Sequence, residues 1–137
     1  MTRFVMFVLG LWVLEALGQP NSVHLFAEGT KDVIYEFAVS ARRAEQLPHW
    51  TPGARFPPLT IDSAVRTAEK WMKKRYPDIE HFELTEVTIK KMPYPLTDGD
   101  RWYYRIRFDP HLNGLYGGQF TAVVLFDNSI VEPRTRD

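Results

Sequence analysis

The chain has no cysteine among its 137 residues, and its charges balance, with 17 Lys and Arg against 17 Asp and Glu. The lack of cysteine excludes disulfides, thiolate metal sites and cysteine nucleophiles together. The neutral charge argues against a nucleic-acid partner, because nucleic-acid-binding domains need a concentrated positive field. Both absences narrow the function before any motif is considered.

The chain also lacks an apolar run long enough to span a membrane. Its longest run covers residues 4–14, about half of the roughly 20 residues that a spanning helix needs. Arg3 precedes this run, and Ala16 and Gly18 place small residues just before a cleavage point. This layout predicts a signal peptide over residues 1–18, with an uncleaved membrane anchor as the alternative.

Cleavage would leave about 119 residues, enough for one domain with no membrane span. We therefore expect an exported protein, either periplasmic or secreted. Small secreted domains of animals usually depend on disulfides, so a chain without cysteine favours a bacterial source.

Catalytic and metal-binding motifs are missing as well. No serine lies in a Gly-x-Ser-x-Gly turn, and the four histidines are scattered without a metal-ligand spacing. The acidic stretches at 98–100 and 109–114 are typical of turns and loops between strands. The sequence predicts no catalytic residue, no metal site and no cofactor, and we interpret the protein as a non-enzyme.

What the sequence does contain is a pattern of strands around one helix. Residues 19–30 are mixed, and we expect a flexible N-terminal segment there, ahead of a single domain over residues 31–137. Alternating apolar and polar residues predict a strand over 32–41. Four prolines make 47–59 a stiff connection, and apolar spacings of three and four predict a helix over 61–76.

Three strands are predicted after the helix. The first, over 82–89, changes phase near Thr85 and Glu86, which indicates a bulge or two halves that bury different faces. The second alternates strictly over 101–108, and the third, over 120–126, is apolar on both faces, as a central or well-covered strand would be. The order predicts an α+β fold, β-α-β-β-β, with one helix packed on an antiparallel sheet of about four strands. The helix is expected to cover the row formed by Trp102, Tyr104, Ile106 and Phe108.

Four stretches of the chain carry a family resemblance. Ala64 and Ala68 lie on the helix, Lys-Arg-Tyr-Pro at 74–77 ends it, and Tyr-Tyr-Arg-Ile-Arg-Phe at 103–108 and Val-Val-Leu-Phe-Asp-Asn-Ser-Ile-Val at 123–131 follow. Together they resemble a PepSY-like domain with a cystatin-like fold, over roughly residues 60–131. Ser129, where the family usually has glycine, and the long loop at 109–118 depart from its pattern.

PepSY-type domains are similar to inhibitory or regulatory modules of exported peptidases. The resemblance therefore implies an exported peptidase or another envelope protein as the partner. The Gln-x-Val-x-Gly hairpin of cystatin inhibitors is absent, so the sequence does not support inhibition of cysteine proteases by that motif.

Five residues are candidates for contact with a partner: Trp50, Tyr94, Arg101, Tyr103 and Arg105. The last three share a strand face with Arg107, and arginine beside tyrosine is favoured at interfaces. The alternative is that these arginines pair with Glu86 across the sheet. Prolines on both sides of Tyr94 stiffen its loop, which lowers the entropy lost on binding; Tyr94 and Trp50 could instead fold back over the core.

Two functional hypotheses follow. The first, which we favour, is a small exported protein-interaction module without catalytic activity that regulates a peptidase or binds an envelope protein. The alternative is a small-ligand-binding or enzymatic domain that uses the concave face of the sheet. That alternative requires two or more of His81, Glu83, Asp109 and His111 to meet in a cavity.

Overall fold

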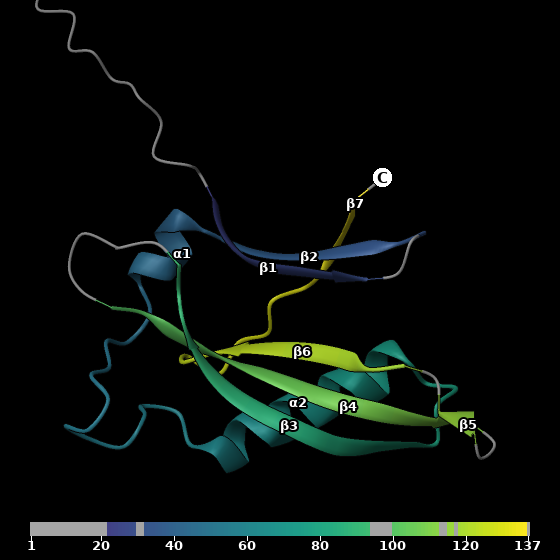
Figure 1. The fold of residues 1–137 in the computed structure, drawn as a ribbon. Coiled ribbons are helices and arrows are strands. Elements are labelled where there is room, and N and C mark those ends of the chain that lie inside the picture. The colour runs from purple at the N-terminus through teal and green to yellow at the C-terminus, as the bar shows by residue number, and fades with distance from the viewer. Residues whose placement is uncertain (1–21, 30–31, 94–99, 113–114, 117, 137) are drawn as a thin grey trace, which may run out of the picture.

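The computed structural model describes residues 22–29, 32–93, 100–112, 115–116 and 118–136. Two antiparallel sheets and one long helix form three layers, with the larger sheet in the middle (Figure 1). The small sheet consists of β1 (Ser22–Gly29), β2 (Ile34–Ser40) and β7 (Arg134–Arg136), in that order. The α+β class predicted from the sequence is confirmed. The single sheet predicted with it is wrong, because the strand expected over 32–41 belongs to the small sheet and not to the sheet that the helix covers.

The main sheet is built around β4 (Trp102–Leu112). On one side β4 pairs with β3 (His81–Lys91), and on the other with β6 (Phe120–Leu125) and the short β5 (Leu115–Tyr116). β6 is therefore an edge strand, although both of its faces are covered. Its apolar composition reflects that cover, since a strand buried on both faces needs no polar row.

The long helix, α2 (Ile61–Arg75), packs on the lower face of the main sheet in Figure 1. The Thr60 side chain caps it by accepting a hydrogen bond from the Ser63 N–H, and three basic residues in its last turn suit the helix dipole. Ala64, Ala68 and Met72 are fully buried against the sheet. As predicted, they meet the row of alternating residues of β4: Tyr104, Ile106 and Phe108, with Trp102 at its margin.

The predicted bulge in β3 is also present. Leu84 pairs with Phe108 and Glu86 pairs with Arg107, so Thr85 is the extra residue, and its hydroxyl donates to the Arg107 carbonyl (3.2 Å). One inserted residue reverses which side chains face the helix. This is why the apolar residues change phase along β3.

The N-terminal part of the domain differs from the prediction. Residues 22–29, expected to be flexible, form β1, which pairs with β2. Val23 and Leu25 alternate with exposed His24 and join Phe37 and Val39 in a second core cluster between the two sheets. A pattern of two buried apolar residues was too short to distinguish this strand from a loop in the sequence.

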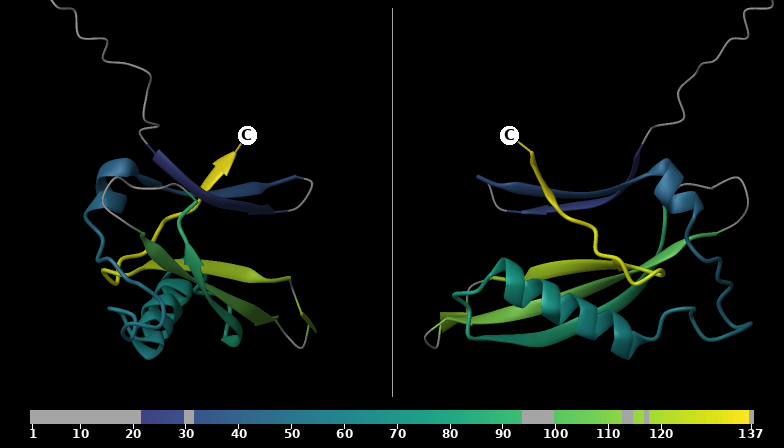
Figure 2. Two further views of the ribbon diagram at one scale, coloured as in Figure 1. Left: turned by 60° about the vertical axis from the view of Figure 1, so that its left-hand side comes forward. Right: turned by 180° about the vertical axis from the view of Figure 1, so that it is seen from behind.

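The chain ends with a crossing from one sheet to the other. After β6, the turn at Asp127–Ser129, with Asn128 at φ 67°, brings Ile130 back to bridge Val124. The segment that follows rises along the outside to the small sheet, where β7 pairs with β2 (yellow in Figure 2). The sequence did not predict β7, because its residues are all polar and are ordered only by β2. A short helix, α1 (Ala41–Glu45), follows β2, and the proline-rich connection lies before α2.

Candidate functional site

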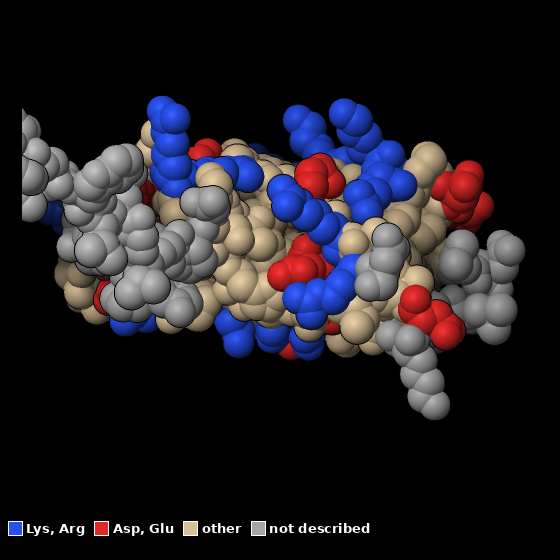
Figure 3. Space-filling model, turned by 90° about the horizontal axis from the view of Figure 1, so that it is seen from above, with Lys and Arg blue, Asp and Glu red and all other residues tan. Residues whose placement is uncertain are grey.

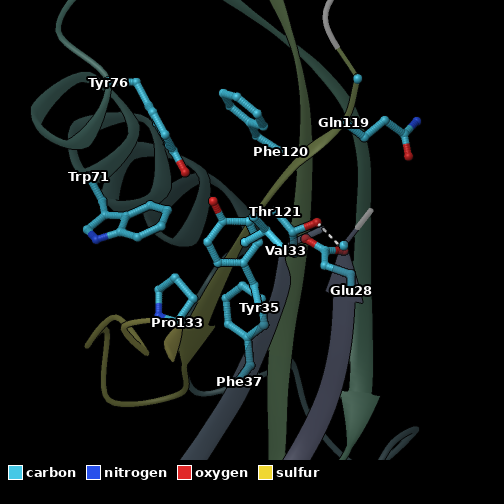
Figure 4. Close-up of a pocket in the computed structure, with 12 residues that line it drawn as sticks. Glu28, Val33, Tyr35, Phe37, Trp71, Tyr76, Gln119, Phe120, Thr121 and Pro133 are labelled. Carbon is cyan, nitrogen blue, oxygen red and sulfur yellow. Dashed lines mark hydrogen bonds between the residues drawn. The ribbon is translucent and has the colours of Figure 1, made fainter. Parts of the chain in front are cut away.

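A cleft of about 540 Å³ opens where the three layers meet at the β6 edge (Figure 4). The β1–β2 hairpin forms one wall, the end of α2 forms the opposite wall, and the start of β6 lies between them. The lining is mainly aromatic and aliphatic, with few polar groups: Val33, Tyr35, Phe37, Trp71, Tyr76, Phe120 and Pro133, with Glu28, Gly29, Gly118, Gln119 and Thr121. This composition is typical of binding sites, which are mostly apolar with a small number of placed polar groups.

The hairpin wall is held by close backbone approach at its tip. A Cβ on Gly29 would lie 2.0 Å from the Val33 carbonyl oxygen, so only glycine fits there. Phe37 is 2 % exposed and its ring stacks on Phe26 at 4.7 Å between centroids. The tip carries Glu28, and its position is therefore set by backbone geometry and by the core.

The helix wall is fixed by a small network at the end of α2. The Trp71 indole N–H donates to the Glu132 carboxylate (2.8 Å), and Arg75 pairs with the same carboxylate (3.4 Å). The Arg75 guanidinium lies 5.3 Å from the centre of the Trp71 ring, and the Tyr76 ring stacks on Phe120 at 4.5 Å. The aromatic wall is thus preformed, which lowers the entropy cost of binding.

The floor of the cleft reaches the edge of the main sheet at Thr121, a residue that is 5 % exposed. Farther along β6, the Val123 carbonyl and the Leu125 N–H point outward and bond to Val131 and Ser129 (3.0 and 2.9 Å). The backbone groups of Thr121 have the same outward phase, because hydrogen-bonding direction alternates along an antiparallel strand. Within the described residues, no strand pairs with β6 on that side at Thr121. The cleft therefore combines an aromatic pocket with an edge residue whose backbone pairs with no strand among the described residues on that side.

Glu28 is the one acidic residue among the described residues of the lining. Its carboxylate accepts a hydrogen bond from the Thr121 hydroxyl (2.9 Å), which holds the carboxylate in the cleft (Figure 4). Thr121 itself is 5 % exposed. The described lining contains no histidine, serine or lysine. This arrangement can bind and orient a ligand, but it offers no nucleophile paired with a base.

The structure places the predicted partner-contact residues away from this cleft. Arg101 and Tyr103 are 1 % and 2 % exposed and offer no surface to a partner. The Arg101 guanidinium bonds to His49 and to the Glu45 carbonyl, and Tyr103 lies in the core cluster between the two sheets. Trp50 folds back onto Trp102, at 5.3 Å between rings, as the alternative interpretation proposed. Tyr94 lies outside the described residues.

Arg105 and Arg107 follow the predicted alternative of pairing across the sheet. Glu86 contacts Arg105 at 3.4 Å and Arg107 at 3.7 Å. The pKa of Glu86 is held below its ordinary value, mainly by a hydrogen bond from Thr88 and to a smaller extent by the two arginines. Arg105 also lies over the Phe26 ring at 5.6 Å, so the small sheet reaches this row too.

The residues required by the ligand-binding alternative meet only as neighbours on β3 and β4. His111 contacts the Glu83 carboxylate at 3.1 Å, and its ring lies 5.3 Å from that of His81. His81 and Glu83 are exposed, and none of the three lines the cleft. Among the described residues, no group of three or more His, Cys, Asp or Glu is placed to hold a metal ion.

The upper face of the small sheet carries both signs of charge (Figure 3). Glu36 accepts from His24 at 2.7 Å and pairs with Arg136 at 3.3 Å, so basic and acidic side chains alternate there. This mixed surface differs from the single-sign field that nucleic-acid binding requires. The cleft is therefore the better candidate for a binding site.

The cleft residues were visible in the sequence only as core residues. Trp71 and Tyr76 belong to the apolar stripe of the predicted helix, and Tyr35 and Phe37 to the alternating row of a strand. Both patterns correctly predict burial, but they do not show that part of each aromatic surface faces a cleft. A helix stripe that ends on two large aromatics was the available signal.

The fold and site together define a three-layer α+β domain with an aromatic cleft beside the edge strand β6. Comparison with protein-family models, with curated proteins and with solved structures finds no match to this chain. No helix within the described ranges is long and apolar enough to cross a bilayer.

Proposed function

We propose that this protein is a non-catalytic interaction module that binds an extended peptide segment in the aromatic cleft. The observation that carries the proposal is the outward-facing backbone of Thr121 beside the aromatic walls. In strand addition, backbone hydrogen bonds to a sheet edge supply affinity, and pockets for alternate side chains supply specificity. The cleft provides both parts.

The size of the cleft agrees with a short segment. Its volume of about 540 Å³ lies within the roughly 300–1,000 Å³ of ordinary ligand sites. Pro133 closes one end and Phe120 with Gln119 lies at the other, so two or three residues of an extended chain would occupy it.

The sequence supports a proposal for the kind of partner. The predicted signal peptide supports an exported protein, in a periplasm or outside the cell. The order α2, β3, β4 and β6 agrees with the PepSY-like interpretation of residues 60–131, with the β1–β2 hairpin as an addition to it. On that basis the segment would belong to an exported peptidase or an envelope protein.

A second candidate is a small apolar ligand in the same cleft. It is favoured by the aromatic lining alone and needs no contribution from the backbone of Thr121. The ligand would bind in the cleft and not on the concave face of the sheet, since α2 and the small sheet cover the two faces of the main sheet.

Nuclear magnetic resonance titration of the ¹⁵N-labelled protein with Ac-Ser-Val-Leu-Val-Ser-NH₂ tests the proposal. We expect the Thr121 amide and Trp71 indole signals to shift and saturate. Two further peptides carry an N-methyl group on the central Leu or on the Val after it. Only one of these two amides faces β6 in an added strand, so one methylation should abolish binding and the other should be tolerated.

A cleft variant and a matched control complete the test. Tyr35→Ala should weaken binding, whereas Phe56→Ala, at a ring that is 92 % exposed outside the cleft, should not. Shifts that ignore both N-methyl groups would favour the small-ligand candidate. An absence of any cleft shift would refute the peptide-binding proposal.

A further inference from the structure

We propose that the cleft selects a segment in which a Lys or Arg side chain lies between two apolar residues, with Glu28 as the specificity-determining residue. This inference rests on the proposed function and names the chemistry of its ligand. It starts from a carboxylate that has no basic partner within the described part of the chain.

Two carboxylates lie near the cleft, those of Glu132 and Glu28, and their partners differ. Glu132 is compensated, because Arg75 pairs with it and the Trp71 indole donates to it. Glu28 is half-buried, and its carboxylate accepts a hydrogen bond from the neutral Thr121 hydroxyl. A carboxylate kept among apolar groups is costly unless a cation joins it, so the free cleft has a net preference for a positive ligand group.

The surroundings of Glu28 suit a long basic side chain. Val33 and Tyr35 provide apolar and aromatic surface beside it on the same wall. Lys and Arg lay their aliphatic stems along such surface while the charged end reaches a polar group. Aromatic faces also attract the cation itself.

Strand geometry then fixes where the neighbours of that basic residue lie. The Thr121 side chain points to the hairpin side of β6, whereas Phe120 and Ala122 point to the helix side. In a strand added along this edge, successive side chains alternate between the same two directions. One residue would face Glu28, and those before and after it would face Trp71 and Tyr76.

Arg75 explains why the helix side should take apolar groups rather than a second cation. Its guanidinium already lies near the Trp71 and Tyr76 rings, at 5.3 and 5.7 Å from their centres. A further positive charge there would be repelled. The predicted ligand is therefore apolar–basic–apolar.

The test compares three peptides that differ only at the centre: Ac-Ser-Val-Lys-Val-Ser-NH₂ and its norleucine and glutamate counterparts. Norleucine keeps the aliphatic stem of lysine without the charge. We expect the protein to bind the lysine peptide about tenfold more tightly than the norleucine peptide, as one charge-assisted hydrogen bond predicts. The glutamate peptide should bind least, and the lysine preference should shrink as salt is raised.

Glu28→Gln assigns the preference to its residue. The glutamine keeps the shape and can still accept from Thr121, so the fold should persist, and we expect lysine and norleucine to bind within about twofold of each other. The control Glu69→Gln removes an exposed carboxylate of α2 outside the cleft and should keep the full lysine preference.

The outcomes separate the two proposals. Equal binding of lysine and norleucine by the unaltered protein, or a lysine preference that survives Glu28→Gln, would overturn the assignment of Glu28 while leaving peptide binding intact. Failure of every peptide to shift the cleft signals would instead overturn the proposed function, and this inference with it.

Discussion

Replacement of Arg101 by alanine should destabilise the protein far more than a change at a surface arginine. Arg101 is 1 % exposed, and its guanidinium donates to His49 Nδ1 (2.8 Å) and to the Glu45 carbonyl (2.9 Å). These bonds tie the start of β4 to the segment after α1. Hydrogen bonds from a charged donor contribute about 1.5–3 kcal/mol, and the truncation also removes the packing of a buried side chain.

From these contacts we expect Arg101→Ala to lower the free energy of unfolding by about 3 kcal/mol. In a domain of this size the midpoint of thermal unfolding would fall by about 12 °C. Arg101→Lys keeps the charge but not the planar fork of donors, and should lose about half as much. Urea unfolding followed by circular dichroism measures these differences, provided that the slope with denaturant is unchanged.

Arg66→Ala, at an exposed position of α2, is the control and should change stability by less than about 0.5 kcal/mol. A loss at Arg101 as small as that would refute the reasoning. It would mean that the bonds to Glu45 and His49 do not hold this side chain in solution.

Two further predictions concern the hairpin tip and the buried tyrosines. Gly29→Ala forces a Cβ against the Val33 carbonyl oxygen, so we expect a loss of about 1–3 kcal/mol in urea unfolding and weaker peptide binding as Glu28 moves; unchanged stability would contradict the close approach. Burial raises the pKa of Tyr103 and Tyr104, with the Arg105 charge opposing the rise at Tyr103. The unfolded chain then loses these protons first, so stability is full below about pH 10 and falls as the pH rises through the raised folded values. Tyrosinate absorbance during an alkaline titration should show late ionisation that Tyr104→Phe reduces, and ionisation of all tyrosines together near pH 10 would contradict it.

The two proposals place recognition where three separate parts of the chain meet. The hairpin supplies Glu28 and Tyr35, α2 supplies Trp71, and β6 supplies the backbone of Thr121. Since the hairpin is anchored in one core cluster, α2 in the other and β6 in both, the cleft keeps its shape only while both clusters are intact. Core substitutions are therefore expected to change binding as well as stability.

The sequence by itself determined the elements whose patterns are long. The helix at Ile61–Arg75 has four turns of apolar spacing and a capping Thr60, and β4 alternates without interruption. The bulge at Thr85 was also visible, because a phase change in an alternating strand has few explanations. Such local signals need no knowledge of distant residues.

Only the tertiary structure decided what covers the other face of the main sheet. β1 and β7 have weak patterns of their own and become strands by pairing with β2. β1 is its neighbour in a hairpin, whereas β7 lies at the far end of the sequence. Their sheet buries Tyr103, and the end of α1 with the segment after it holds Arg101, although the strand pattern alone placed both residues on a face open to a partner. The cleft arises in the same way, since aromatic residues of a helix and of a hairpin both read as core. Whether their surfaces touch each other or leave a space depends on how the layers stack, and the pattern within one segment carries no information on that.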